Sequence, residues 1–172
     1  MDCKRNTESA IPIVLYKGEG TVEKFCVGRY NDYDLSDLEQ IATIIAQDNG
    51  VTIQILPKLN RNDPNYEKIY FGLIGTTYEG KCPDLKVITI EGKQEYLEFE
   101  SYSRPFSAKK LSRMITNGSK QSDKIIIDIR DTNITGGYVR RQVFNRKHDK
   151  SFNREIKEIW TYNGTDLKKE WG

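Results

Sequence analysis

The chain has 172 residues, of which 37% are hydrophobic and 30% charged, with a formal net charge of +2 and a mean hydropathy of −0.68. This length supports one ordinary hydrophobic core, so we expect a single domain rather than two full ones. The absence of a long apolar run excludes a membrane span, and the polar segment 1–10 is unlike a secretory signal, so a cytoplasmic location is expected. Cys3, Cys26 and Cys82 lack any metal-ligand or disulfide spacing, so we expect thiols.

The order of β-rich and helix-compatible segments predicts an α/β fold with a mixed central sheet flanked by helices. In chain order we expect a hairpin of strands at 11–16 and 21–27, a helix at 36–49, strands at 51–56 and 69–77, a second hairpin of strands at 85–90 and 95–101, a helix at 107–117, a strand at 125–129, a helix at 139–144 and a last strand at 156–162. Residues 1–30 would form an N-terminal extension and hairpin, and residues 31–172 the main α/β domain.

Local signals fix several of these boundaries. Ser36 and Glu39 have the spacing of a capping box at the start of the first helix, and Asn49-Gly50 ends it. Ser107 is a suitable N-cap for the second helix, which Asn117-Gly118 ends. Because a strand, a helix and a further strand follow one another here, we expect a parallel strand pair with a right-handed crossover.

Carboxylates gather around the second predicted hairpin. Glu98 and Glu100 lie two residues apart on one strand and therefore point to the same face, while Asp84 precedes the neighbouring strand. Carboxylate oxygens are the ligands that Mg²⁺ or Mn²⁺ prefers, and such an ion can activate water beside a phosphodiester. The alternative is that both glutamates face solvent on an edge strand while Leu97 and Phe99 face the core.

The order of motifs resembles a known family. It consists of an acidic helix, a strand ending in Leu56-Pro57, Pro83-Asp84 opening a hairpin, Glu98 on its second strand, a basic helix, and 120–123 leading into Ile125-Ile126-Ile127-Asp128. This layout, from about Asp34 to Trp160, resembles the tRNA-cleaving C-terminal toxin domains of contact-dependent growth inhibition proteins, which belong to the PD-(D/E)XK nuclease superfamily.

The resemblance implies a restriction-endonuclease-like core and specific roles for four residues. Asp84 would bind the metal ion, and Glu98 would be the acidic residue of the E-x-K signature. Glu39 would match an additional acidic residue near the metal, although its capping-box position also explains it. Gln121 would match a polar residue that borders the active site.

Glu100 stands where the family has its lysine, which normally orients the attacking water. A lysine from elsewhere, with Lys93, Lys109 and Lys110 as candidates, could replace it. Alternatively, Glu100 is an additional metal ligand, or the chain keeps the fold without hydrolysis.

Basic residues provide candidate contacts to nucleic acid, with RNA favoured over DNA. The segments Lys109–Arg113 and Arg140–Lys150 are strongly basic, whereas Asp32–Asp48 is acidic. Aromatic side chains near basic ones, such as Tyr102 and Tyr138, can stack on unpaired bases. The candidates for nucleic-acid binding are Lys109, Lys110, Arg113, Lys120, Arg140, Arg141 and Tyr102.

Three functions remain open from the sequence. The leading hypothesis is a metal-dependent nuclease that acts on RNA, tRNA included, and that pairs with an immunity protein if it belongs to a toxin. The second is an inactive relative that binds nucleic acid or protein. The third is a metal-independent ribonuclease using the single histidine, His148, although its charged surroundings favour a solvated side chain.

Overall fold

The computed structural model describes residues 10–101 and 107–172, and Tyr102 therefore lies outside the described residues. The chain forms two compact units, Met1–Tyr96 and Leu97–Gly172. Strand β5 (Gln94–Glu100) begins in the first unit and ends in the second. Each unit is described by itself below.

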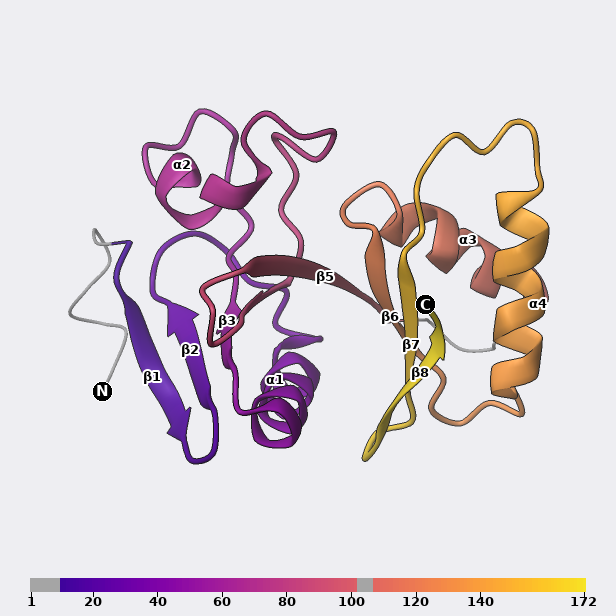
Figure 1. The fold of residues 1–172 in the computed structure, drawn as a ribbon, viewed down its shortest axis with the longest axis horizontal. Helices are drawn as coiled ribbons and strands as arrows, with labels where there is room; N and C mark the ends of the chain where they lie inside the picture. Colours follow the sequence, from indigo (N-terminus) through magenta and orange to yellow (C-terminus); the bar gives the residue numbers. More distant parts are fainter. Residues whose placement is uncertain (1–9, 102–106) are drawn as a thin grey trace. The chain divides into compact units, whose positions relative to one another are not determined.

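The first unit combines a strand hairpin, a long helix and two further strands (Figure 1). Strands β1 (Pro12–Lys17) and β2 (Thr21–Phe25) are antiparallel, β2 is parallel to β3 (Thr52–Ile55), and β3 is antiparallel to β4 (Leu85–Ile88). Helix α1 (Leu35–Asn49) buries Leu38, Ile41, Ala42 and Ala46, which recur at helical spacing. It ends at Gly50, whose φ of 62° is the left-handed conformation that glycine favours.

A tyrosine-rich segment forms the second core of this unit. Helix α2 (Tyr66–Ile69) and the 3₁₀ helix η2 (Phe71–Leu73) bury Tyr66, Ile69, Tyr70 and Leu73 against Phe25, Leu56 and Tyr96. The rings of Tyr66 and Tyr70 stack with centroids 4.9 Å apart, and those of Tyr70 and Tyr96 with centroids 6.5 Å apart. Burial raises the pKa of Tyr96 to about 12, because a buried phenolate is poorly solvated.

The second unit contains the end of β5 and three further strands, with two crossover helices (Figure 1). Strand β5 is parallel to β6 (Lys124–Asp128), β6 is parallel to β7 (Glu158–Tyr162), and β7 is antiparallel to β8 (Leu167–Trp171). Helix α3 (Ala108–Gly118) connects β5 to β6, and α4 (Gly136–Lys147) connects β6 to β7. The parallel pair expected around the second helix is therefore confirmed.

One apolar cluster lies between the strands and helices of the second unit. It joins Leu111 and Ile115 of α3, Val139 and Val143 of α4, and Ile125, Ile127 and Ile159 of the strands. Trp171 packs against the same cluster, and Trp160 lies on the neighbouring strand, with Lys169 Nζ 5.0 Å from its ring centroid. Burial of this cluster is the main stabilising contribution within the unit.

The predicted α/β class is confirmed, with an N-terminal hairpin, eight strands in mixed pairing and four α-helices among the described residues. The predicted strand at 69–77 is wrong. Tyr66, Ile69, Tyr70 and Leu73 have the i, i+3, i+4, i+7 spacing of a helical face, and Gly75, with a φ of 77°, lies in the turns that follow.

Two further expectations need correction. The capping box at the first helix is absent, since the N-cap residue is Asp34 and Ser36 lies inside the helix. Cys26 is disulfide-bonded, so the expectation of a thiol is wrong there, whereas Cys82 keeps a thiol that donates a hydrogen bond to the Leu59 carbonyl at 3.3 Å. Over the part of the chain that is described, no helix has the length and apolar character needed to cross a bilayer.

Candidate functional site

Asp84 of the first unit has a lysine beside its carboxylate. Lys58 Nζ lies 2.8 Å from Asp84 Oδ1 and also donates a hydrogen bond to the Cys82 carbonyl at 2.5 Å. The side chain of Asp84 is only 12% exposed, whereas that of Lys58 is 41% exposed. The pair is thus held by the protein on one side and accessible to water on the other.

The local backbone places this pair at the end of β3 and the start of β4. The Leu56 amide donates to the Asp84 carbonyl at 2.8 Å, which extends the antiparallel pairing beyond the two strands. Tyr70 Oη donates to the Pro57 carbonyl at 2.5 Å and anchors the same segment. Burial, with a further contribution from the Asp84 charge, raises the pKa of Tyr70, so this phenol stays protonated and can donate.

Glu98 and Glu100 of the second unit lie on the helix-covered face of their strand. They are paired with Ile125 and Ile127 of β6, and both isoleucines belong to the cluster beneath α3 and α4. Side chains at paired positions of neighbouring strands share a face, so the two glutamates point toward the helices. Gly118 of α3 supports this, because a Cβ there would lie 3.2 Å from Glu100 Cγ.

The solvent-facing alternative for these glutamates is wrong for Glu98, which is only 8% exposed. Leu97 and Phe99 are also buried, at 5% each, so both faces of β5 are covered at this point. Glu100 and Gln121 are half-buried. The Gln121 amide donates to the Gly118 carbonyl at 2.9 Å, which places Gln121 in the turn between α3 and β6.

Glu39 lies on α1 and forms an ion pair with Lys24, with Nζ 3.8 Å from Oε1. Lys24 and Val22 alternate with Glu23 and Phe25 along β2, and Phe25 belongs to the tyrosine-rich core. Glu39 is therefore on the α1 side of the first unit's strands, opposite the face that carries this core.

The carboxylates predicted to bind metal are distributed over both units. Asp84 and Glu39 belong to the first unit, and Glu98, Glu100 and Gln121 to the second. Among residues 10–101 and 107–172, no group of three or more His, Cys, Asp or Glu side chains could hold a metal ion. Mg²⁺ commonly takes only one or two carboxylates, with water and substrate as its other ligands, so the metal site stays a prediction.

The basic residues predicted to contact nucleic acid differ in their interaction partners. Arg140 Nη1 lies 2.5 Å from Glu170 Oε2, and Lys120 Nζ lies 3.3 Å from Asn117 Oδ1. Lys110 is half-buried. Lys109, Arg113 and Arg141 are exposed and form no ion pair within the described part of the chain, so they are the candidates with charges most available to a phosphate.

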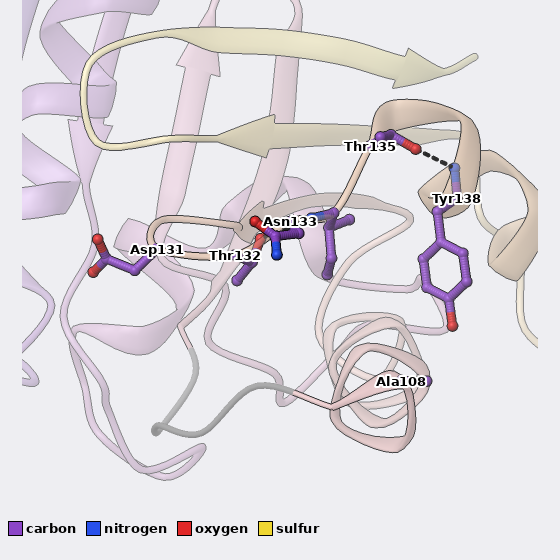
Figure 2. A pocket seen from close by; sticks show the side chains of 7 residues that line it. Ala108, Asp131, Thr132, Asn133, Thr135 and Tyr138 are labelled. Atoms are coloured by element: carbon purple, nitrogen blue, oxygen red, sulfur yellow. Dashed lines mark hydrogen bonds between the residues drawn. The ribbon is translucent and has the colours of Figure 1, made fainter.

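The second unit also has a pocket at the start of its two helices, beyond the end of β6 (Figure 2). It has a volume of about 600 Å³ and is lined by Ala108, Thr132, Asn133, Ile134, Thr135 and Tyr138, together with Asp131. In Figure 2 the Tyr138 side chain extends from α4 toward Ala108, and the Asp131 carboxylate points away from the other lining side chains. The sequence indicated Tyr138 as a base-stacking residue but did not indicate the pocket.

Sequence reasoning also missed a buried polar row in the first unit. Glu23, Gln54 and Lys86 are paired across β2, β3 and β4, and Gln54 Nε2 donates to Glu23 Oε2 at 2.7 Å. Lys86 Nζ donates to the Ile69 carbonyl at 2.8 Å, and Lys86 is only 5% exposed. Burial of the ammonium group lowers the pKa of Lys86 to about 8, against the opposing effect of the Glu23 charge.

The sequence contains a signal for each of the two lysines that the sequence analysis missed, Lys86 and Lys58. Lys86 is a charged residue within an otherwise apolar strand. Because lysine is almost never fully buried without a partner, this position indicates a side chain with a specific partner. Lys58 follows Leu56-Pro57 at the end of a predicted strand, but its approach to Asp84 depends on strand pairing that the sequence does not specify.

Comparison with protein-family models, with curated proteins and with solved structures yields no match for this chain.

Proposed function

We propose that this chain is a nuclease-like domain that hydrolyses phosphodiester bonds of RNA, with tRNA as one candidate substrate. The sequence resemblance alone assigns Asp84 and Glu98 as ligands of Mg²⁺ or Mn²⁺. The observation that carries the proposal is the Lys58 ammonium group, 2.8 Å from the Asp84 carboxylate. It supplies a lysine beside the principal acidic residue, although Glu100 occupies the position at which the resemblance requires one.

The order and pairing of the elements support a restriction-endonuclease-like core. The order is α1-β3-α2-η2-β4-β5-α3-β6, with β3 and β4 antiparallel and β5 and β6 parallel. A tight turn closed by the Thr89 amide and the Lys93 carbonyl, 3.0 Å apart, connects β4 to β5. This is the succession on which the resemblance to the PD-(D/E)XK superfamily depends.

The donor chemistry fits a hard divalent cation. Asp84 and Glu98 both carry carboxylates, the ligand type that such a cation prefers. Both residues are buried, with 9% exposure for Asp84 and 8% for Glu98. When bound, the ion would activate a water molecule and stabilise negative charge at phosphorus. Lys58, which is partly open to solvent, would orient that water and offset charge in the transition state.

Cleavage assays with the full chain test this function. RNA, tRNA and DNA are incubated with Mg²⁺, with Mn²⁺ or with excess EDTA, and products are separated on denaturing gels. Lys58→Met, Asp84→Asn and Glu98→Gln should each lower the cleavage rate by about 100-fold or more, because each removes an electrostatic contribution to the transition state. Thermal unfolding of every variant distinguishes lost chemistry from lost folding.

A matched control removes a different ion pair of the first unit. Arg61 Nη2 lies 2.5 Å from Glu79 Oε1 in an exposed pair, so Arg61→Met should leave cleavage unchanged. Wild-type rates in both Asp84→Asn and Glu98→Gln would refute the metal mechanism. Cleavage that persists in EDTA would instead favour a metal-independent ribonuclease.

A second candidate is a non-catalytic module that binds nucleic acid. Glu100, in the position of the family lysine, packs against Gly118 of α3, and Lys109, Arg113 and Arg141 carry exposed charges without internal ion pairs in the described chain. RNA binding that weakens with added salt, without cleavage under any metal condition, would support this module over the nuclease.

A further inference from the structure

We propose that the pocket at the start of α3 and α4 binds an unpaired nucleobase. The site lies wholly within the second unit and is formed by Ala108, the segment 132–135 and Tyr138. This inference deepens the proposed function and rests on it in one respect, since RNA is taken as the source of the base.

The dimensions of the pocket suit a ligand of this size. Its volume of about 600 Å³ lies within the range of roughly 300–1,000 Å³ typical of small-molecule sites. Ala108 is the first residue of α3, and its small side chain leaves the space opposite Tyr138 open (Figure 2). A larger residue at this exposed helix start would fill the site without disturbing the core.

Apart from the Asp131 carboxylate, which points away from the other lining side chains (Figure 2), the polar groups of the pocket are neutral. Thr132 Oγ1 already donates to the Ile129 carbonyl at 2.6 Å, and Thr135 Oγ1 accepts from the Tyr138 amide at 3.3 Å. The side chains of Asn133 and Tyr138 make no hydrogen bond with any described residue. An amide offers both a donor and an acceptor, which matches the edge of a nucleobase.

The charge at the α4 start disfavours a phosphate as the principal ligand. The Glu170 carboxylate lies so close to Gly136 that a Cβ there would be 2.0 Å from Glu170 Oε2. This carboxylate already occupies the positive end of the α4 dipole. Because a carboxylate already occupies this helix end, and is itself paired with Arg140 Nη1 at 2.5 Å, the helix end offers no open positive site to a phosphate, whereas a neutral base needs none.

Tyr138 provides an aromatic surface held in place by the core. Its ring packs against the apolar cluster of the second unit, and the residue is half-buried. An aromatic ring fixed in this way can stack on any base at little cost in side-chain entropy. Lys109 follows Ala108 directly and is exposed, so a phosphate next to the bound base could contact its ammonium group.

Binding of ribonucleoside 5′-monophosphates to the full chain tests the site. All four nucleotides are titrated in EDTA and followed by NMR, with ribose 5-phosphate and inorganic phosphate as probes that lack a base. At least one nucleotide should bind, and ribose 5-phosphate should bind about 10-fold more weakly or not at all, because base stacking is absent.

Three variants separate the pocket from the rest of the surface. Ala108→Phe fills the space and Asn133→Leu removes the amide, so each should weaken nucleotide binding by about 10-fold. Asn145→Leu, the same change at an exposed asparagine of α4 outside the pocket, should have no effect. Equal binding of ribose 5-phosphate, equal binding to Ala108→Phe, or no nucleotide binding would each overturn the proposal.

Failure of this inference and failure of the nuclease proposal give different results. Nucleotide binding in EDTA requires no catalysis. A protein that binds bases but never cleaves RNA would therefore support the base-binding pocket and contradict the nuclease proposal. If Ala108→Phe cleaves RNA with unchanged rate and base preference, the nuclease proposal is supported and the base-binding pocket is contradicted.

Discussion

In the first unit a buried ammonium group lies within a strand, whereas two buried carboxylates of the second unit, those of Asp128 and Glu170, lie near strand ends. Lys86 occupies the second position of β4 and is 5% exposed, with its ammonium group donating to the Ile69 carbonyl. Asp128 is the last residue of β6, and Glu170 is the fourth residue of β8.

The partners of these buried charges also differ between the two units. Asp128 and Glu170 each contact an arginine, with Arg130 Nη2 2.6 Å from Asp128 Oδ2 and Arg140 Nη1 2.5 Å from Glu170 Oε2. Ile125, Ile126 and Ile127, in the interior of β6, are fully buried at 0% exposure. Away from Glu98 in β5, the second unit thus combines an apolar interior with ion pairs near strand ends, while the first unit buries the Lys86 ammonium group within its sheet.

The largest expected effect comes from the apolar interior of the second unit. Ile127→Ala should lower the free energy of unfolding by about 2–5 kcal/mol, because it removes buried methyl groups and leaves a cavity. Urea denaturation followed by circular dichroism measures this change. Ile90→Ala, at a position that is 84% exposed, should change stability by less than about 0.5 kcal/mol. Similar losses in both variants would contradict the comparison.

An intermediate effect is expected from pH at Lys86. Its pKa in the folded protein is about 8, below the value of about 10.4 for an unfolded lysine. Between these two values the unfolded chain binds a proton that the folded chain does not, so stability should rise with pH, by on the order of 2 kcal/mol between pH 8 and 10. Well below pH 8, where the folded and unfolded chains both bind the proton, this contribution is constant.

Lys86→Met isolates the contribution, because it keeps a long apolar side chain without the titrating amine. Urea denaturation of both proteins at pH 7, 8, 9 and 10 gives the difference between their free energies of unfolding. That difference should shrink steadily above pH 8. A difference that does not change with pH would show that Lys86 does not titrate in this range.

The smallest expected effect concerns the ion pair at the start of α4. Gly136→Ala should destabilise the protein by about 1–2 kcal/mol, since the new Cβ would displace the Glu170 carboxylate. Gly137→Ala is the matched control, because its Cβ would meet nothing closer than Arg140 Nη2 at 3.7 Å. It should be neutral or stabilising by about 0.5 kcal/mol, as alanine favours helix over glycine. Thermal unfolding compares the two, and equal destabilisation would contradict the proposed contact.

Periodicity in the sequence was sufficient for most elements. Both hairpins, the helices beginning at Leu35 and Ala108, and the buried strand 124–128 are confirmed, because the turn glycines and the apolar spacing agree there. The Ser107 hydroxyl accepts from the Lys110 amide at 3.3 Å, as the N-cap prediction requires.

The failures have physical causes. Strand β8 was missed because Leu167-Lys168-Lys169-Glu170-Trp171 is mostly charged, as edge strands often are, although Asn163-Gly164 is a hairpin signal. The segment 69–77 was predicted as a strand because it is an apolar run, but its first residues continue the helical spacing that begins at Tyr66. The Asp84–Lys58 pair could not be predicted, since it depends on the pairing of β3 with β4.

The location of Trp160 and Trp171 has a practical consequence for work on this protein. They are the two tryptophans of the chain, and both belong to the second unit. Indole fluorescence excited at its red edge therefore reports on that unit alone. Unfolding confined to the first unit would be silent in this signal, so a mismatch between the fluorescence and amide hydrogen-exchange midpoints would reveal that the halves of the chain melt independently.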